Sequence, residues 1–528
     1  MGGRADWLTR RLREAIADGR LPVGGRLPAT RVLAAELGVS RGVVTEAYQR
    51  LAEDGHVVGR GRAGTVVVAA PLTGEVAGEV SAGGVAGGAL AGRSADGKFA
   101  GPPAGAASAV PSVGGGSAEP LVGGVSAGRA ARLVPADSVG VGVPGGSAVG
   151  GVFAGPPGAD AFDALRAVPG RIDLSPGVPD LGAFPRAAWL RAERAVLRTL
   201  SASDFGYGDP SGAPALRRAV ARWLARYRGV RVDPREIVVV AGVAQALGLL
   251  TRVLGRAGIT SVAVEDPGSL GARQHLRDGG LDTPPVPVDA EGVRVDALRD
   301  GGAAAVLLTP AHQFPTGVVL SGGRRRELMR WADAGGLVIE DDYDAEHRYD
   351  RRPVPALRAM LPERVCYAGS VSKVLAPALR VGWLIVPGAY RDAVVEAKRY
   401  ADLGNAVLPQ LVLAELMESG DLERHLRFVR RRHRRRRDAM VEAIARHLPD
   451  AVVHGAAAGL HLLITFDDSV SDTDLAAAAL ARGVKVQPLS WHAQEPGRPG
   501  LVLGYGASGP SDIAEGVAVI AEVRRRES

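Results

Sequence analysis

Apolar and polar positions follow three different patterns along this chain of 528 residues. Near the N-terminus, apolar side chains recur at helical spacing and predict three short helices, over 8–18, 31–37 and 41–53. From about residue 166 onward, short apolar runs of strand type alternate with longer helical patterns. Neither pattern is present in between. The chain is therefore predicted to contain two folded regions joined by a segment without a core.

The strand-like runs of the C-terminal region are almost continuously apolar, as is typical of strands buried on both faces. Helical patterns separate them, so we expect a mostly parallel sheet with helices on both sides, in one large α/β domain with a smaller appended domain. The predicted strands are 237–240, 261–264, 305–308, 337–340, 365–368 and 382–386.

The segment between the two regions is rich in small residues. Of the 72 glycines in the chain, 24 fall within 72–160, mixed with Ala, Ser, Val and Pro. Such side chains bury too little surface to offset the entropy of ordering, which predicts a flexible linker. Weak β segments built on the scattered valines are the alternative. The predicted domains are therefore 1–70, a linker over 71–165, and 166–528.

Composition and charge add three constraints. Lys and Arg exceed Asp and Glu by 64 to 57, a net charge of +7, which favours a polyanionic partner. The single cysteine excludes an intramolecular disulfide and a multi-cysteine metal site, and we expect no bound metal. An apolar run long enough to span a bilayer and the apolar core of a signal peptide are both missing, so we expect a cytoplasmic protein without membrane contact.

The N-terminal pattern predicts a helix-turn-helix. A short turn at Gly38 joins the second and third helices, and Ser40 is a good N-cap for the third. In this arrangement the later helix enters the major groove of DNA, where Arg41 and Thr45 are long and polar enough to reach phosphates or base edges. Two valine-rich runs then flank a basic turn containing Arg62, which predicts a hairpin.

These residues closely resemble the winged helix-turn-helix of GntR-type regulators. The resemblance implies that Arg31, Arg41 and Arg62 contact DNA, with Ser40 and Thr45 assisting. A small structural helical domain with solvated arginines is the alternative. The matching segments are 19–22, 26–28, 37–41, 47–48 and 64–65, with Leu51 and Gly55.

Lysine is rare in this chain, since only Lys98, Lys373, Lys398 and Lys485 supply a primary amine. Lys373 follows a predicted strand among hydroxyl and apolar residues, and Arg380 lies seven positions later, placed to hold an anion. This environment suits an amine that forms a Schiff base with a phosphorylated aldehyde. Burial would favour its neutral, nucleophilic form. The alternative is an ordinary solvated surface lysine.

Other segments supply what such a cofactor needs. The turn Gly242-Val243-Ala244 joins a predicted strand to a helix, and its backbone N–H groups can approach a phosphate. Asp341 and Tyr343 end a buried strand, where open α/β sheets place ligands. A carboxylate there can pair with a pyridinium nitrogen, and a phenol can hydrogen-bond a phenolate oxygen.

In their order along the chain, these segments resemble the fold type I aminotransferase domain of pyridoxal-phosphate enzymes over residues 166–528. The resemblance implies that Lys373 holds pyridoxal phosphate as an internal aldimine, that Asp341 pairs with the ring nitrogen and that Tyr343 contacts the 3′ oxygen. It also implies a homodimer. The phosphate ligands it implies are Ser370, Arg380, the turn at Gly242, Val243 and Ala244, and Tyr207 of the partner subunit.

Residues 312–317 read His-Gln-Phe-Pro-Thr-Gly, where aminotransferases carry His-Asn-Pro-Thr-Gly. Together with Glu-Asp-Asp-Tyr-Asp at 340–344, this form resembles the MocR subgroup of GntR-type regulators, in which the aminotransferase-like domain follows the DNA-binding domain. The resemblance implies a transcription regulator that binds operator DNA and senses pyridoxal phosphate, or an amino-acid or amine effector, through Lys373. A catalytic aminotransferase with an appended DNA-binding domain is the alternative. A DNA-binding protein with a vestigial cofactor domain is a third reading.

Two departures from the family pattern predict weak transaminase activity at most. Val502 stands where the family carries an arginine that clamps the substrate carboxylate, and Ser269 stands where an aromatic residue often stacks on the cofactor. A bidentate arginine contact is worth about 1.5–3 kcal/mol, so its loss should weaken amino-acid binding. If amino acids bind weakly, pyridoxal phosphate itself can be the effector that the regulator senses.

The segment 424–437 contains nine arginines and two histidines. On a helix these charges would surround most of the circumference. A solvated structural helix is the favoured interpretation, and contact with the DNA backbone is the alternative.

Overall fold

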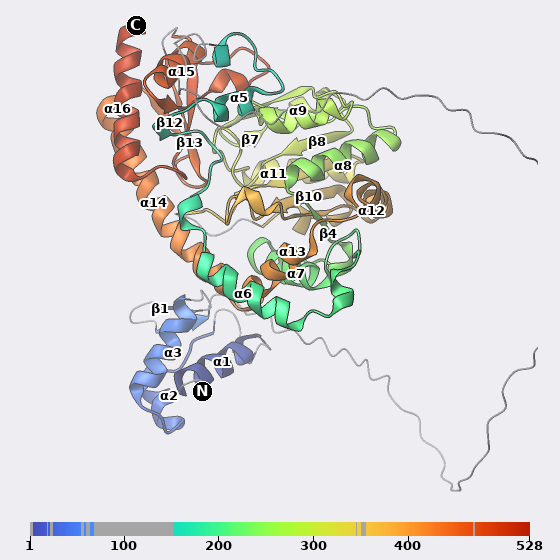
Figure 1. The fold of residues 1–528 in the computed structure, drawn as a ribbon, viewed down its shortest axis with the longest axis vertical. Coiled ribbons are helices and arrows are strands. Elements are labelled where there is room, and N and C mark those ends of the chain that lie inside the picture. Colours follow the sequence, from blue (N-terminus) through green and yellow to red (C-terminus); the bar gives the residue numbers. More distant parts are fainter. Residues whose placement is uncertain are drawn as a thin grey trace, which may run out of the picture. The chain divides into compact units, whose positions relative to one another are not determined.

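The structure is a computed structural model that describes residues 4–17, 20–21, 25–53, 57–59, 64–67, 151–344, 346–349, 355–467 and 470–527. These residues form an N-terminal unit and a C-terminal domain (Figure 1). Most of the predicted linker, 71–150, lies outside the described residues. Among the helices that are described, none combines the length and apolarity needed to span a membrane.

The N-terminal unit has the predicted helices and hairpin. A shared core holds them together, because the buried residues of the helices pack against Val57 and Val67, which face each other across the hairpin. Backbone bonds from Leu27 to Thr65 and from Val67 to Gly25 add the preceding segment to the hairpin. The elements are α1 (Arg4–Ala17), α2 (Thr30–Glu36), α3 (Arg41–Glu53), β1 (Val57–Gly59) and β2 (Thr65–Val67).

The C-terminal domain is built on an eight-stranded sheet, which confirms the predicted α/β class. Every predicted strand in this domain is present, with ends shifted by one or two residues. In chain order the strands are β4 (Val238–Val240), β5 (Ala263–Asp266), β6 (Pro285–Asp289), β7 (Gly292–Val293), β8 (Ala305–Leu308), β9 (Leu337–Asp342), β10 (Val365–Ser370) and β11 (Gly382–Ile385).

The strand order across the sheet is β4-β11-β10-β9-β8-β5-β6-β7. The five central strands from β10 to β6 run parallel, whereas β11 is antiparallel to both neighbours and β7 to β6. The sheet is therefore mostly parallel, as predicted. In such a sheet the carboxyl ends of the central strands meet at one edge, which is where ligands bind in open α/β folds.

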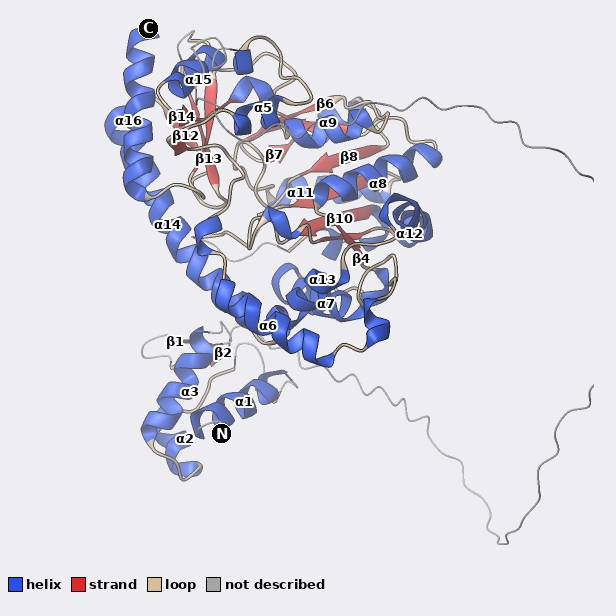
Figure 2. Ribbon diagram, in the orientation of Figure 1, coloured by secondary structure: helices blue, strands red, loops and turns tan. Residues whose placement is uncertain are grey.

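Helices cover both faces of this sheet (Figure 2). On one face the apolar residues of α8, α9 and α12 pack on the strands, and on the other face α10 and α11 cover one half while α7 and α13 cover the other. The covering helices are α7 (Pro214–Arg228), α8 (Val243–Arg256), α9 (Leu270–Asp278), α10 (Val295–Asp300), α11 (Gly322–Asp333), α12 (Gly388–Asp402) and α13 (Val407–Glu418). Along the outside run α6 (Arg186–Thr199) and the long α14 (Asp421–His447).

The appended subdomain has a four-stranded antiparallel sheet in the order β12-β13-β16-β15 and a short parallel pair, β14 and β3. Its core is shared with the end of α14 and with α15 and α16. The elements are β3 (Ile172–Asp173), β12 (Val452–His454), β13 (His461–Thr465), α15 (Asp472–Ala481), β14 (Val484–Lys485), β15 (Gln487–Pro488), β16 (Gly500–Gly504) and α16 (Pro510–Glu527).

The folded domain begins before residue 166, the boundary expected from composition. Residues 151–165 contain a short 3₁₀ turn (Gly151–Phe153) and most of α5 (Ala161–Ala167). Phe153 and Leu165 are 5% and 2% exposed and belong to the core of the appended subdomain, where Phe153 stacks on Trp491. The end of the predicted linker is therefore part of the domain, because its few large apolar side chains pack into the core of the appended subdomain.

Candidate functional site

The acidic end of β9 divides its carboxylates between the two faces of the sheet, as the twofold period of a strand requires. Asp342 pairs with the buried Arg228 at 2.6 Å and accepts a 2.5 Å hydrogen bond from Tyr367. Glu340 accepts two backbone N–H bonds from the turn at 357–358. Both therefore stabilise the fold. Asp341, between them, points to the opposite face.

Asp341, like Asp342, has one buried carboxylate oxygen without a hydrogen-bond partner, but no described residue forms an ion pair with it. Its Oδ1 atom is buried and has no hydrogen bond from any residue that the structure describes. Burial, and secondarily the charge of Asp342, raise the pKa of Asp341 to about 7, while Lys373 acts in the opposite direction. An unsatisfied buried carboxylate oxygen is costly, so this position suits a cationic N–H group.

Lys373 lies in the turn that follows β10. Its Nζ donates a 2.5 Å hydrogen bond to the carbonyl oxygen of Gly177. Gly177 has φ = +79°, and a Cβ there would lie 3.1 Å from Nζ, so the glycine leaves room for the amine. Burial lowers the pKa of Lys373, while the charges of Asp344 and Asp341 oppose that shift. The amine is therefore easier to deprotonate than a surface lysine.

Strand register brings together the residues expected at the phosphate. Ser370 pairs with Gly382 across β10 and β11, and Gly382 pairs with Val240 across β11 and β4. A Cβ on Gly382 would lie 3.1 Å from the Cα of Gly242 and 3.1 Å from the Cβ of Ser370. The missing side chain thus allows the serine and the turn before α8 to approach each other.

The same place carries features that attract an anion. Gly242 is the N-cap of α8, with φ = +89° and no capping side chain, so the first N–H groups of the helix, including those of Val243 and Ala244, lack intrahelical acceptors. The Nη1 atom of Arg380 lies 3.5 Å from where a Cβ of Gly242 would be. A helix N-terminus, a hydroxyl and a guanidinium are groups that can bind a phosphate together.

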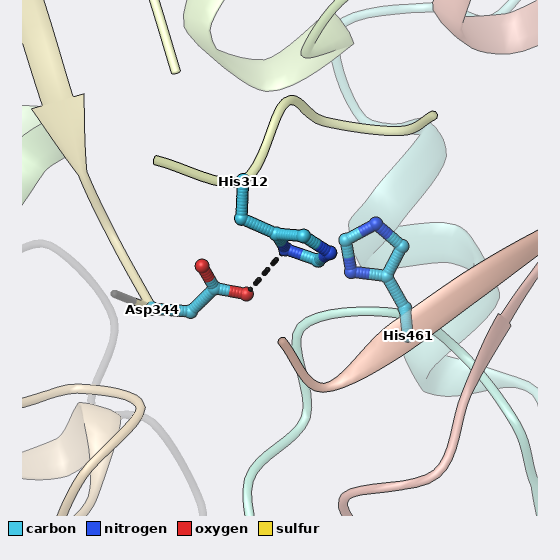
Figure 3. A group of neighbouring side chains, drawn as sticks. All are labelled: His312, Asp344 and His461. Carbon is cyan, nitrogen blue, oxygen red and sulfur yellow. Dashed lines mark hydrogen bonds and ion pairs between the residues drawn. The ribbon is translucent and has the colours of Figure 1, made fainter. Parts of the chain in front are cut away.

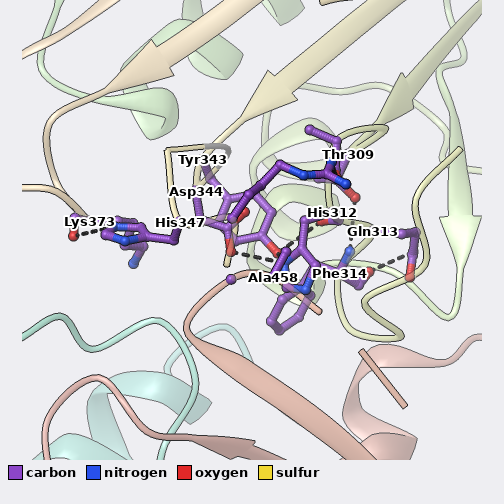
Figure 4. Close-up of polar contacts among 12 residues, drawn as sticks. Thr309, His312, Gln313, Phe314, Tyr343, Asp344, His347, Lys373 and Ala458 are labelled. Atoms are coloured by element: carbon purple, nitrogen blue, oxygen red, sulfur yellow. Dashed lines mark hydrogen bonds and ion pairs between the residues drawn. The ribbon is translucent and has the colours of Figure 1, made fainter. Parts of the chain in front are cut away.

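Tyr343 is held by the His-Gln loop after β8 (Figure 4). Its hydroxyl donates a 3.0 Å bond to the carbonyl oxygen of His312 and lies 3.0 Å from Nδ1 of the same residue. That Nδ1 also lies 2.9 Å from Oδ2 of Asp344. Sequence reasoning noted His312 only as part of a motif and gave no role to Asp344 or to His461, whose ring is 4.9 Å from that of His312.

Tyr207, Val502 and Ser269 differ in their surroundings. Tyr207 is 95% exposed, so within a single chain it does not reach the buried end of β9. Val502 is fully buried in an apolar cluster with Leu463 and Leu489, against which Phe314 packs. Arg498, four positions before Val502, pairs with the exposed Asp467 at 2.8 Å. Ser269 accepts a backbone bond as the N-cap of α9 and offers no ring for stacking.

The N-terminal unit presents its polar residues to solvent. Arg31, Ser40, Arg41 and Thr45 are all exposed, on α2, α3 and the turn between them, and the two arginines form no ion pair within the described part of the chain. The opposite side of these helices supplies the buried core. The predicted contact at Arg62 lies outside the described residues.

The arginines of α14 have mixed surroundings. Arg432 and Arg436 both pair with the buried Asp180, at 2.6 and 3.2 Å, and Arg430 donates to the carbonyl oxygen of Glu346. Arg431 and Arg435 are exposed. Part of the arginine run therefore joins elements of the domain together.

The fold and the site together define a two-part protein: a winged helix-turn-helix followed by a fold type I aminotransferase-like domain. Residues 5–67 match the bacterial regulatory proteins of the gntR family, and residues 169–498 match aminotransferase class I and II. The second match covers more than half of the chain and shows membership of that family.

Two relatives that match nearly the whole chain are named as regulators. The chain is 30% identical over 516 residues to the probable rhizopine catabolism regulatory protein MocR of Rhizobium meliloti, covering 97% of this chain and 91% of the relative. It is 30% identical to the pyridoxine biosynthesis transcriptional regulator PdxR of Corynebacterium glutamicum, over 95% and 91% of the two chains. The multiple substrate aminotransferase of Thermococcus profundus superposes with a TM-score of 0.64 at 28% identity, over 69% of this chain and 93% of that chain.

The chain therefore belongs to the MocR-type GntR regulators, and it is a DNA-binding transcription regulator with an aminotransferase-like domain of the pyridoxal-phosphate type. The expected fold and class are confirmed.

Proposed function

We propose that this regulator binds pyridoxal phosphate at Lys373 and operator DNA through α3, and that the state of the cofactor site controls the DNA complex. One observation carries the cofactor assignment: the half-buried amine of Lys373 and the buried Asp341 Oδ1, which has no hydrogen-bond partner among the described residues, lie close enough to shift each other's pKa. A pyridine aldehyde requires an amine at its aldehyde group and a carboxylate at its ring nitrogen.

Different residues of the chain would bind different parts of this cofactor. Asp341 would pair with the ring nitrogen, and Tyr343 would hydrogen-bond the 3′ oxygen. The turn at Gly242, Val243 and Ala244 would bind the phosphate, with Ser370 and Arg380. When bound, pyridoxal phosphate supplies an aldehyde that reacts reversibly with primary amines. Burial of Lys373 would keep its amine in the form that can attack that aldehyde.

The apolar surroundings of Val502 bear on the signal. Val502, Leu463 and Phe314 offer no cation for a carboxylate, which favours pyridoxal phosphate itself or a simple amine over an amino acid. The Corynebacterium relative is named as a regulator of pyridoxine biosynthesis, which supports the same choice. Efficient transamination of amino acids is the second candidate, and the same apolar cluster counts against it.

A homodimer would complete the site. Tyr207 and Phe205 are 95% and 60% exposed, and Leu403 and Tyr400 on a neighbouring segment are 55% and 74% exposed. A Cβ on Gly404 would lie 3.4 Å from the Asp209 carbonyl oxygen, so the two segments lie side by side. Contiguous exposed apolar side chains favour an interface, and we propose that Tyr207 reaches the phosphate of the partner subunit there.

The test is binding of the full chain to its own upstream DNA, with and without pyridoxal phosphate, for the unchanged chain and for Lys373→Ala. We expect the cofactor to change the affinity or the footprint of the unchanged chain and to have no effect on the variant. The same affinity and footprint in both states would contradict sensing. Turnover of amino acids at ordinary enzyme rates would favour the aminotransferase instead.

A further inference from the structure

Three buried polar side chains from separate parts of the chain meet in one cluster (Figure 3). His312 comes from the loop after β8, Asp344 from the turn after β9, and His461 from the first position of β13. They are 2%, 2% and 1% exposed. One nitrogen or oxygen from each lies within 4.8 Å of the others, and Nδ1 of His312 lies 2.9 Å from Oδ2 of Asp344.

The two histidines each have an unsatisfied atom. Nε2 of His312 and Nε2 of His461 are buried, and neither has a hydrogen-bond partner among the residues that the structure describes. A buried polar atom left without a partner costs about 1–3 kcal/mol, so two in one cluster indicate a missing ligand.

The arrangement of the rings fits a shared metal ion. With metal–nitrogen bonds of about 2.0–2.1 Å and tetrahedral angles, two imidazoles on one Zn²⁺ have ring centroids about 5 Å apart. The centroids of His312 and His461 are 4.9 Å apart, with their planes at 51°. The bond from His312 to Asp344 is the carboxylate–histidine contact that commonly orients a metal-ligating imidazole.

We propose that His312 and His461 bind one divalent transition-metal ion of the kind that prefers imidazole, such as Zn²⁺, with Asp344 orienting His312. The remaining coordination positions are filled by water or by a small ligand. Carboxylate-preferring ions such as Mg²⁺ do not fit, because imidazole nitrogens outnumber the oxygen donors. The cluster lies next to Tyr343, but the metal proposal does not depend on the assignment of pyridoxal phosphate to Lys373.

The test uses the tag-free full chain, stripped with a chelator and titrated with Zn²⁺ by calorimetry, and with Co²⁺ by its visible absorption. We expect one equivalent per chain. His312→Gln and His461→Gln should each lose that equivalent, and Asp344→Asn should weaken Zn²⁺ binding by about 10–100-fold, as is usual when the partner of a ligating histidine is removed. His275→Gln changes an exposed histidine of α9 and should bind as the unchanged chain does.

Thermal unfolding with and without Zn²⁺ is the second measurement, because Zn²⁺ should raise the Tm of the unchanged chain and of His275→Gln but not of His312→Gln or His461→Gln. If one of the two histidine variants fails to fold, the other still tests whether the cluster binds Zn²⁺. The absence of a bound equivalent in the unchanged chain would overturn the proposal, as would an equivalent that survives both histidine substitutions. Pyridoxal-phosphate absorbance, recorded on the same samples, shows separately whether the cofactor assignment holds.

Discussion

The N-terminal unit and the C-terminal domain use charged side chains in opposite ways. In the N-terminal unit, Arg31 and Arg41 are exposed and form no ion pair within the described residues, while the other side of the same helices forms a small apolar core. In the C-terminal domain, Asp341 and Lys373 lie where burial shifts their pKa values towards neutral forms. Exposed charges suit a ligand that is itself a large polyanion, and buried ones suit a small ligand that must be enclosed.

The arginines of the C-terminal domain also include both buried and exposed side chains. Arg228 is buried against Asp342 and stabilises the fold, whereas Arg431 of α14 is exposed. Four predictions test this comparison, in order of expected effect.

The largest effect is expected for Arg228→Leu, because it leaves the carboxylate of Asp342 buried without its counter-charge. Such a change costs roughly 3–5 kcal/mol of unfolding free energy. Chemical denaturation of the full chain measures it, with Arg31→Ala as the control that should stay within about 0.5 kcal/mol. Equal unfolding free energies for the two variants would contradict the claim that buried arginines stabilise the fold more than exposed ones.

Asp341→Asn should change how stability depends on pH. The pKa of Asp341 is raised from 3.8 to about 7 in the folded chain, so the stability it contributes is complete at low pH and is lost as pH rises from about 4 through 7. The variant should therefore lose less stability over this range, by on the order of 2–4 kcal/mol. Glu265 also has a pKa raised to about 7, so part of the pH dependence remains. Denaturation of the cofactor-free chain at pH 4 and pH 8 measures the difference, and parallel pH profiles would contradict it.

Arg41→Ala should weaken operator binding by about 1–3 kcal/mol and lower the salt dependence of binding by about one phosphate contact. The fold should be unaffected, because Arg41 is exposed and makes no ion pair in the described part of the unit. Titration of operator DNA at several salt concentrations measures both quantities. Ala35, an exposed residue of α2, provides a matched control as Ala35→Ser. Unchanged affinity for Arg41→Ala would mean that α3 does not read the operator.

The smallest effect is expected for Arg431→Ala, which should change neither operator binding nor unfolding free energy by more than about 0.5 kcal/mol. Arg436→Ala, on the same helix, removes a buried ion pair with Asp180 and should destabilise the domain measurably. A loss of DNA affinity in Arg431→Ala comparable to that of Arg41→Ala would show that α14 contacts the DNA backbone.

Much of the fold followed from local sequence patterns. Continuous apolar runs marked the strands of the parallel sheet, because burial on both faces demands apolar residues at every position. The boundary at residue 166 was placed too late, since composition averages over a window and misses single anchors such as Phe153. The motifs at 340–344 and at Lys373 were visible because their residues are adjacent in the chain.

The sequence by itself determined the class of this protein and the order of its two parts, and it singled out Lys373 among four lysines, since each of these depends on neighbours in the chain. The tertiary structure decided what the acidic residues on either side of Asp341 do, because Glu340 and Asp342 have structural partners on the opposite face of the strand. It alone brought His312, Asp344 and His461 together, as these positions come from three different elements. Spacing along the chain carries no information about contacts made by the packing of a second sheet against the first.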